Sequence, residues 1–336
     1  MLKRTAVATA YSVAKSWGVE RAVSSSGWRG RRLLILCWHG ISLDDEHRWD
    51  PCLYVSPTVF RERLEILAHG RYNVLSLHEG LERLRRDDLP PRSVALTFDD
   101  GFYDFSVHAA PAMAAFGFPS TVYLTTYYVD HQVPIFNLMV SYLLWKGRGA
   151  GKSLPDGTPL VTEADARLAR KRFLDAVEPG TSAPQKEGIA RQLARDLNLD
   201  YGAFSKSRLL HLMNSDEVKR LAQQNVTFEA HTHRHCMPAH PELMRRELRD
   251  NMTRIEELVG RRPRHFCYPS GNYRREFFPI FEEEDLLSAT TCLAGISSRA
   301  DDRFLMPRFL DHTGVTRLQF EGWLSGLYAV GRSATR

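Results

Sequence analysis

The sequence predicts an α/β fold built on a parallel sheet, either open or closed into a barrel. Apolar runs typical of buried parallel strands alternate with segments that have the periodicity of amphipathic helices. The 336 residues fit one large domain, because barrels of alternating strands and helices reach this length. A hydrophobic fraction of 43% and a charged fraction of 25% are ordinary for a soluble globular protein.

The alternation begins at the continuous apolar run 33–38, which is typical of a buried strand. Ser56 and Pro57 then form a helix start, as N-cap and first-turn proline, and Gly70 ends that helix. Further elements follow in the same rhythm. Strands are expected at 72–75, 94–98, 120–124, 226–230 and 265–268, and helices at 77–86, 106–116, 215–223 and 241–259.

Two regions lie outside this rhythm. Residues 1–32 predict an N-terminal helix followed by a polar linker over 24–32, which leaves residues 33–336 as the main domain. The N-terminal helix either packs on the protein, which is the simpler interpretation, or lies on a membrane surface. Residues 130–214 predict a helical insertion, with helices at 135–145, 163–176 and 185–197. The insertion either faces the substrate or covers exposed barrel surface.

Composition excludes several classes of protein. The net charge of +5 comes from arginines interspersed with acidic residues, so we expect no nucleic-acid partner. Five widely spaced cysteines without a CxxC pair argue against a disulfide framework and favour the cytoplasm. No apolar run reaches 18 residues, so no membrane-spanning helix is predicted.

Polar side chains with the chemistry of a metal site follow several predicted strands. Asp99 and Asp100 come directly after 94–98, and His231 and His235 come directly after 226–230. Functional groups gather at the carboxyl ends of parallel strands, so these side chains are expected to share one site. One carboxylate and two imidazoles form a common hydrolytic metal shell, which leaves the second carboxylate free to act as a base. An Asp-Asp pair alone is more often part of a turn, and two histidines four positions apart are more often ordinary surface residues. Their joint occurrence favours a metal-dependent hydrolase.

Three motifs resemble those of the polysaccharide deacetylases, the NodB-homology carbohydrate esterases of family four. In chain order they are Thr97-Phe98-Asp99-Asp100-Gly101, His231-Thr232-His233-Arg234-His235 and Phe266-Cys267-Tyr268-Pro269-Ser270-Gly271. The resemblance covers about residues 33–310. It implies a distorted, incomplete (β/α) barrel with fewer than eight strands, here with a helical insertion.

The resemblance also implies residue roles. A divalent metal would be held by Asp100, His231 and His235; Zn²⁺ is expected, and Ni²⁺, Co²⁺ or Fe²⁺ tolerate the same ligands. Asp99 would be the general base.

Ser270 would help bind the oxyanion through its backbone N–H. Tyr268 and Pro269 would shape the wall of the site. Cys267 stands where many members have an arginine, so Arg308 is expected to orient the base instead.

Two histidines are candidates for the general acid. Trp38-His39-Gly40 resembles the signature of the exopolysaccharide de-N-acetylase branch, in which the acid histidine precedes the first motif. His312 has the Leu-x-His spacing that other members carry near the C-terminus. We favour His39.

The resemblance thus implies a metal-dependent deacetylase that hydrolyses the N-acetyl amide of a hexosamine in a polysaccharide, oligosaccharide or glycan precursor. An O-acetyl carbohydrate esterase and a catalytically weak glycan-binding or assembly protein are the alternatives. The partner expected is an N-acetylated glycan, with peripheral membrane contact through the N-terminal helix as a further possibility. Related enzymes often work at the cell envelope, which is the alternative to the cytoplasm.

Overall fold

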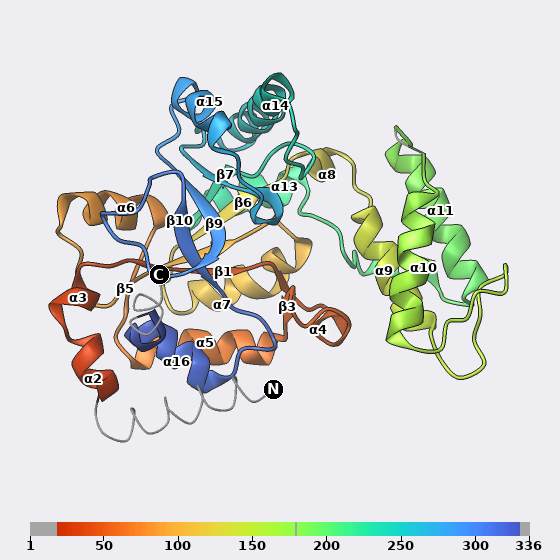
Figure 1. The fold of residues 1–336 in the computed structure, drawn as a ribbon, viewed down its shortest axis with the longest axis horizontal. Helices are drawn as coiled ribbons and strands as arrows, with labels where there is room; N and C mark the ends of the chain where they lie inside the picture. Colours follow the sequence, from red (N-terminus) through yellow and green to blue (C-terminus); the bar gives the residue numbers. More distant parts are fainter. Residues whose placement is uncertain (1–18, 179, 330–336) are drawn as a thin grey trace.

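The computed structural model describes residues 19–178 and 180–329, and in these residues seven parallel strands close into a barrel (Figure 1). The ring runs β1-β10-β9-β8-β7-β6-β5 and closes where β5 pairs with β1. An eighth strand, β4, pairs with the beginning of β5, whereas β6 pairs with its end. The strands are β1 (Leu34–Trp38), β4 (Asn73–Leu75), β5 (Ser93–Phe98), β6 (Ser120–Leu124), β7 (Val226–Ala230), β8 (His265–Cys267), β9 (Ser288–Ala294) and β10 (Met306–Leu310). The prediction of an incomplete barrel is confirmed.

Helices surround the ring and connect its strands (Figure 1). They are α5 (Pro57–His69), α6 (Leu77–Arg86), α7 (Ala110–Ala114), α13 (Ser215–Ala222), α14 (Pro241–Val259), α15 (Phe278–Glu283) and α16 (Arg317–Ser325). Every residue of β1 and β5 is buried, because these strands lie between the barrel interior and the outer helices. None of the described helices combines the length and the apolarity needed to cross a bilayer.

Local signals place several elements where the sequence predicts them. The Ser56 hydroxyl accepts a hydrogen bond from the Val59 N–H, and Pro57 occupies the first turn of α5.

The helix predicted at 106–116 differs from a regular α-helix. It begins as a π-helix, η1 (Phe105–Ala109), and continues as α7. Pro111 has no N–H for the Val107 carbonyl, and its ring would clash there, so the chain takes a wider turn.

The prediction of a polar linker over 24–32 is wrong. Residues there form the end of α2 (Val19–Ser24) and a further short helix, α3 (Gly27–Gly30). The Arg29 side chain is completely buried and donates hydrogen bonds to the carbonyls of Leu324, Arg32 and Ser93. This burial lowers the pKa of Arg29 to about 10. The Arg29 guanidinium group therefore links this segment to α16 and to the first residue of β5.

The N-terminal helix predicted ahead of residue 18 lies outside the described residues. The prediction rests on apolar residues that recur at helical spacing: Val7, Tyr11, Ala14 and Trp17.

The helices predicted within 130–214 are present. They are α9 (Phe136–Gly147), α10 (Glu163–Asp175), α11 (Ala183–Asp196) and α12 (Tyr201–Lys206), and α9, α10 and α11 project to one side of the barrel (Figure 1). They enclose a hydrophobic cluster that also includes Tyr54. The Tyr142 hydroxyl donates to Asp45, beside α4 (Glu46–Trp49), at 2.7 Å, and Lys146 pairs with the same carboxylate.

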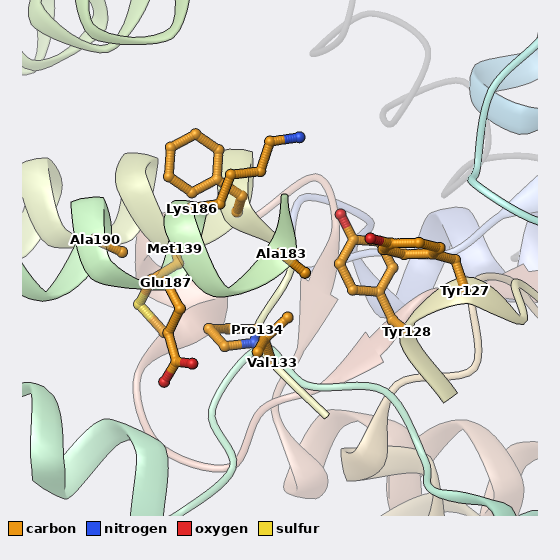
Figure 2. A pocket seen from close by; sticks show the side chains of 10 residues that line it. Tyr127, Tyr128, Val133, Pro134, Met139, Ala183, Lys186, Glu187 and Ala190 are labelled. Carbon is orange, nitrogen blue, oxygen red and sulfur yellow. The ribbon is translucent and has the colours of Figure 1, made fainter. Parts of the chain in front are cut away.

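A narrow crevice separates this insertion from α8 (Tyr127–Asp130), the short helix that follows β6. Tyr127 and Tyr128 form one side of it, and Ala183 and Glu187 of α11 form the other (Figure 2). The Tyr127 ring lies 5.7 Å from the His233 ring, measured between centroids. The insertion therefore meets the barrel beside the second motif.

Candidate metal centre

The two adjacent carboxylates are placed by a tight turn at the end of β5. Asp100 has a left-handed backbone (φ 69°), and Gly101 follows at φ 88°. A Cβ atom on Gly101 would lie 2.3 Å from Leu124 Cδ1, so this turn requires glycine. The turn directs Asp99 and Asp100 toward different partners.

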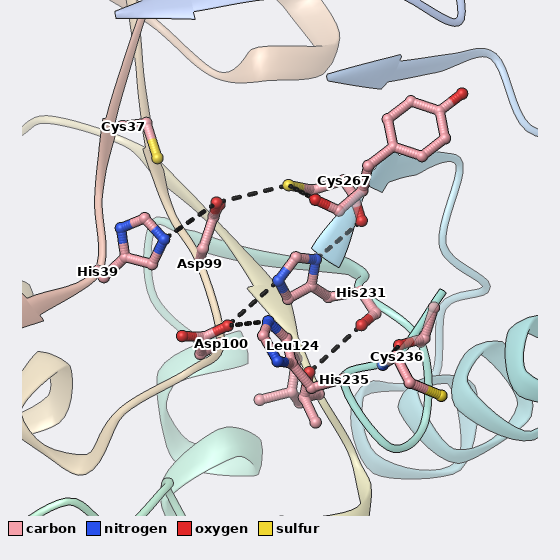
Figure 3. Close-up of polar contacts among 12 residues, drawn as sticks. Cys37, His39, Asp99, Asp100, Leu124, His231, His235, Cys236 and Cys267 are labelled. Atoms are coloured by element: carbon pink, nitrogen blue, oxygen red, sulfur yellow. Dashed lines mark hydrogen bonds and ion pairs between the residues drawn. The ribbon is translucent and has the colours of Figure 1, made fainter. Parts of the chain in front are cut away.

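Asp100 meets two imidazoles from the loop after β7. Its Oδ1 lies 3.2 Å from His231 Nε2 and 3.1 Å from His235 Nε2 (Figure 3). His231 Nδ1 lies 2.8 Å from the Cys267 carbonyl and donates to it, which leaves Nε2 as the ligand nitrogen. The ligand atoms of these three residues lie within 4.8 Å of one another. One carboxylate and two imidazoles in this arrangement can hold a divalent metal ion.

The charges of this cluster also suit a cation. Burial would raise the pKa of Asp100, but the nearby His235 and His231 hold it well below its usual range. Burial would likewise lower the pKa of His235, yet Asp100 raises it above its ordinary value. The carboxylate is therefore ionised, and its negative charge favours a cation beside its oxygens.

Asp99 forms an ion pair with an arginine instead of contacting the two imidazoles of the second motif. Its two oxygens each lie 2.7 Å from a terminal nitrogen of Arg308, which comes from β10, and both residues are buried. Burial would raise the pKa of Asp99, but the Arg308 guanidinium holds it well below its usual range. Arg308 thus contacts the carboxylate that it was expected to orient.

Cys267 lies between these two side chains. Its Sγ is 3.4 Å from Asp99 Oδ2 and 3.1 Å from Arg308 Nη2. Asp99, His231 and Cys267 also bring three ligand atoms within 4.8 Å. Arg308 occupies both oxygens of Asp99, however, and its charge would repel a metal ion there. The Asp100 set is therefore the better metal site.

The two acid candidates lie in different surroundings. His39 follows β1 and places its Nε2 3.7 Å from Asp99 Oδ2 (Figure 3). His312 follows β10, but its Nδ1 contacts the Pro51 carbonyl at 3.1 Å. Within the described part of the chain, no hydrogen bond or ion pair joins His312 to either aspartate.

The third motif is divided between the core and a groove. The expectation that Tyr268 shapes the site wall is wrong, because its ring packs in an interior cluster and its hydroxyl donates to the Phe304 carbonyl at 2.9 Å. Pro269 and the exposed Ser270 instead line an open groove together with His235. Ser270 has a left-handed backbone (φ 55°).

Two contributors to the site were missed from the sequence. Asn251 and Glu247 of α14 hold the segment 231–235 by hydrogen bonds. A pair of polar residues four positions apart on one face of a predicted helix was the available signal. Such pairs usually face solvent, so that signal alone is weak.

Comparison with known proteins agrees with this geometry. A family model described as polysaccharide deacetylase matches residues 86–146 and 192–286. A segment of 102 residues is 28% identical to the poly-beta-1,6-N-acetyl-D-glucosamine N-deacetylase of Escherichia coli K12. That segment is 30% of this chain but only 15% of the relative, so the chain spans a small part of that protein.

Solved structures share the fold at low sequence identity. The Streptococcus pyogenes deacetylase PplD, solved with acetate, aligns over 86% of this chain and 96% of its own, with a TM-score of 0.59 and 18% identity. IcaB from Ammonifex degensii aligns over 88% of this chain and 98% of its own, with a TM-score of 0.57 and 16% identity. The family match, the closed barrel and the three motifs that meet at its rim together make this chain similar to the polysaccharide deacetylases.

Proposed function

We propose that this protein removes the acetyl group from an N-acetylhexosamine in a polysaccharide, oligosaccharide or glycan precursor, by metal-dependent hydrolysis of the amide. One observation carries the proposal: a three-ligand cluster, Asp100 with His231 and His235, lies directly beside the Arg308-bound carboxylate of Asp99. Hydrolysis of an unreactive amide needs both an electrophilic centre and a base within reach of one water molecule.

Asp100, His231 and His235 would hold the metal, for which Zn²⁺ fits the two imidazoles and one carboxylate, while Ni²⁺, Co²⁺ or Fe²⁺ suit the same ligands. When bound, the metal would polarise the acetyl carbonyl and lower the pKa of water.

Asp99 would take a proton from the attacking water. Arg308 keeps this carboxylate ionised and fixes the direction of its oxygens. His39, on the other side of Asp99, would protonate the departing amine. Ser270 lines the groove with a left-handed backbone, and its backbone N–H would stabilise the oxyanion.

The groove beside His235 suits a sugar ring. It is open and mostly polar, and Tyr273 and Arg274 extend it beyond the metal ligand. A glycan could lie there with an acetamido group directed at the cluster. The E. coli relative is named for an N-acetylglucosamine polymer, which supports an N-acetylated glycan as the substrate class.

The direct test of this function is acetate release from N-acetylglucosamine oligomers. We expect release that a chelator abolishes and Zn²⁺ restores. Acetate from acetylxylan alone would identify an O-acetyl esterase. Tight binding to a glycan without acetate from any substrate would identify a binding protein.

The role of Asp99 is tested by Asp99→Asn, with the exposed Asp88→Asn as control. Losing the base should reduce turnover by about a hundredfold or more, because general-base catalysis contributes at least that factor. Metal content, measured by elemental analysis of the same preparations, should stay at the wild-type level, since Asp99 is not among the proposed ligands. Near-normal turnover in Asp99→Asn would show that another group is the base.

The general acid is identified by comparing His39→Ala with His312→Ala. Only His39 lies beside the reacting groups, so its loss should lower kcat strongly, whereas His312→Ala should keep most of the activity. Initial rates of acetate release across a pH series measure both variants. A large rate loss confined to His312→Ala would reverse the assignment.

A further inference from the structure

The ligand-bearing segment 231–235 has an unfavourable backbone. Thr232 and His235 both adopt positive φ angles, 62° and 53°, although neither is glycine. Positive φ angles are unfavourable for residues other than glycine and persist only where the surroundings determine them strongly. Something must therefore hold this segment in place before it can present two imidazoles to one ion.

Asn251, in the middle of α14, contacts His231, the first residue of the segment 231–235. Its side chain is completely buried, and its Oδ1 accepts a hydrogen bond from the His231 backbone N–H at 2.9 Å. Its amide nitrogen donates to the Leu124 carbonyl at 2.9 Å and to Thr126 Oγ1 at 3.0 Å. One amide therefore ties the end of β6 and the end of β7 to the same helix.

Glu247 lies one turn earlier on the same face of α14 and contacts the middle of the segment. Its carboxylate accepts hydrogen bonds from the Arg234 backbone N–H at 2.8 Å and from Arg234 Nη1 at 2.6 Å. Its backbone carbonyl accepts from the His233 N–H at 3.2 Å. The residue just before His235 is thus fixed through two of its donors.

We propose that Asn251 and Glu247 are positioning residues for metal binding: together they hold segment 231–235 so that both imidazoles face Asp100. This inference rests on the metal site of the proposed function. Neither side chain touches the ligand nitrogens, so each acts through the backbone that carries them. Outer groups that orient metal ligands commonly change metal affinity by about 10–100-fold when they are removed.

The test measures metal affinity of the full-length apoprotein in three variants: Asn251→Ala, Glu247→Gln and the control Glu242→Gln. Glu242 lies on the same helix with its side chain 85% exposed. Zn²⁺ affinity is measured by competition with a chelating indicator, and Co²⁺ absorption reports the coordination geometry. We expect the Zn²⁺ Kd to rise at least tenfold in Asn251→Ala and severalfold in Glu247→Gln, with altered Co²⁺ bands. Glu242→Gln should match the wild type.

A purely structural role would give a different result. It would lower the apoprotein Tm of the variants but leave the Kd and the Co²⁺ spectrum of folded protein unchanged, and this outcome overturns the proposal. All titrations are made well below the apoprotein Tm. Glu247→Gln, which keeps the size of the side chain, tests the proposal even if Asn251→Ala fails to fold.

The assay contains no glycan, so it separates the two proposals. Weakened metal binding in a protein that releases no acetate would support the positioning role and contradict the proposed function. Normal metal binding in the variants of an active deacetylase would support the proposed function and contradict the positioning role.

Discussion

Closure of β5 against β1 is the constraint on which the candidate site depends. It brings the carboxyl ends of all seven ring strands to one rim, so side chains far apart in the sequence become neighbours. Asp99 and Arg308, separated by 209 residues, meet there as a buried bidentate pair. An open sheet would leave β1 and β10 remote from β5, and neither His39 nor Arg308 could reach Asp99.

Part of the backbone strain of the described residues lies on this same rim. Asp100, His235 and Ser270 each have a positive φ, and each follows a strand of the ring. Every one of these residues either belongs to the proposed metal cluster or lines the groove beside it. Strained positions of this kind tend to lie where function requires a particular direction of a side chain or an N–H group.

Two neighbouring carboxylates thus acquire different chemistry from their surroundings. Asp99 faces a guanidinium group, which keeps it charged and leaves no room for a metal ion at its oxygens. Asp100 faces two imidazoles, which share its oxygen and can share an ion. Cys267 fits this division, because its small thiol leaves space for Arg308 to approach Asp99 from β10.

Much of this organisation was predictable from the sequence, where the signals are local. The Ser56-Pro57 helix start, the apolar run of β1 and the three motifs each carry their own signature. Other features depend on contacts that a linear sequence does not display. Arg29 is buried where two distant carbonyls, of Ser93 and Leu324, accept its hydrogen bonds, and Tyr268 turns into the core because the Phe304 carbonyl accepts its hydroxyl. Asn251 and Glu247 were missed for the same reason.

The most direct test of the account is anomalous scattering at the zinc edge from a crystal grown with Zn²⁺. The account predicts one strong peak bonded to Asp100, His231 and His235, at about 2.0–2.2 Å from each ligand atom. A peak between Asp99 and Cys267 instead, or the three ligand groups pointing apart with no peak among them, would contradict it.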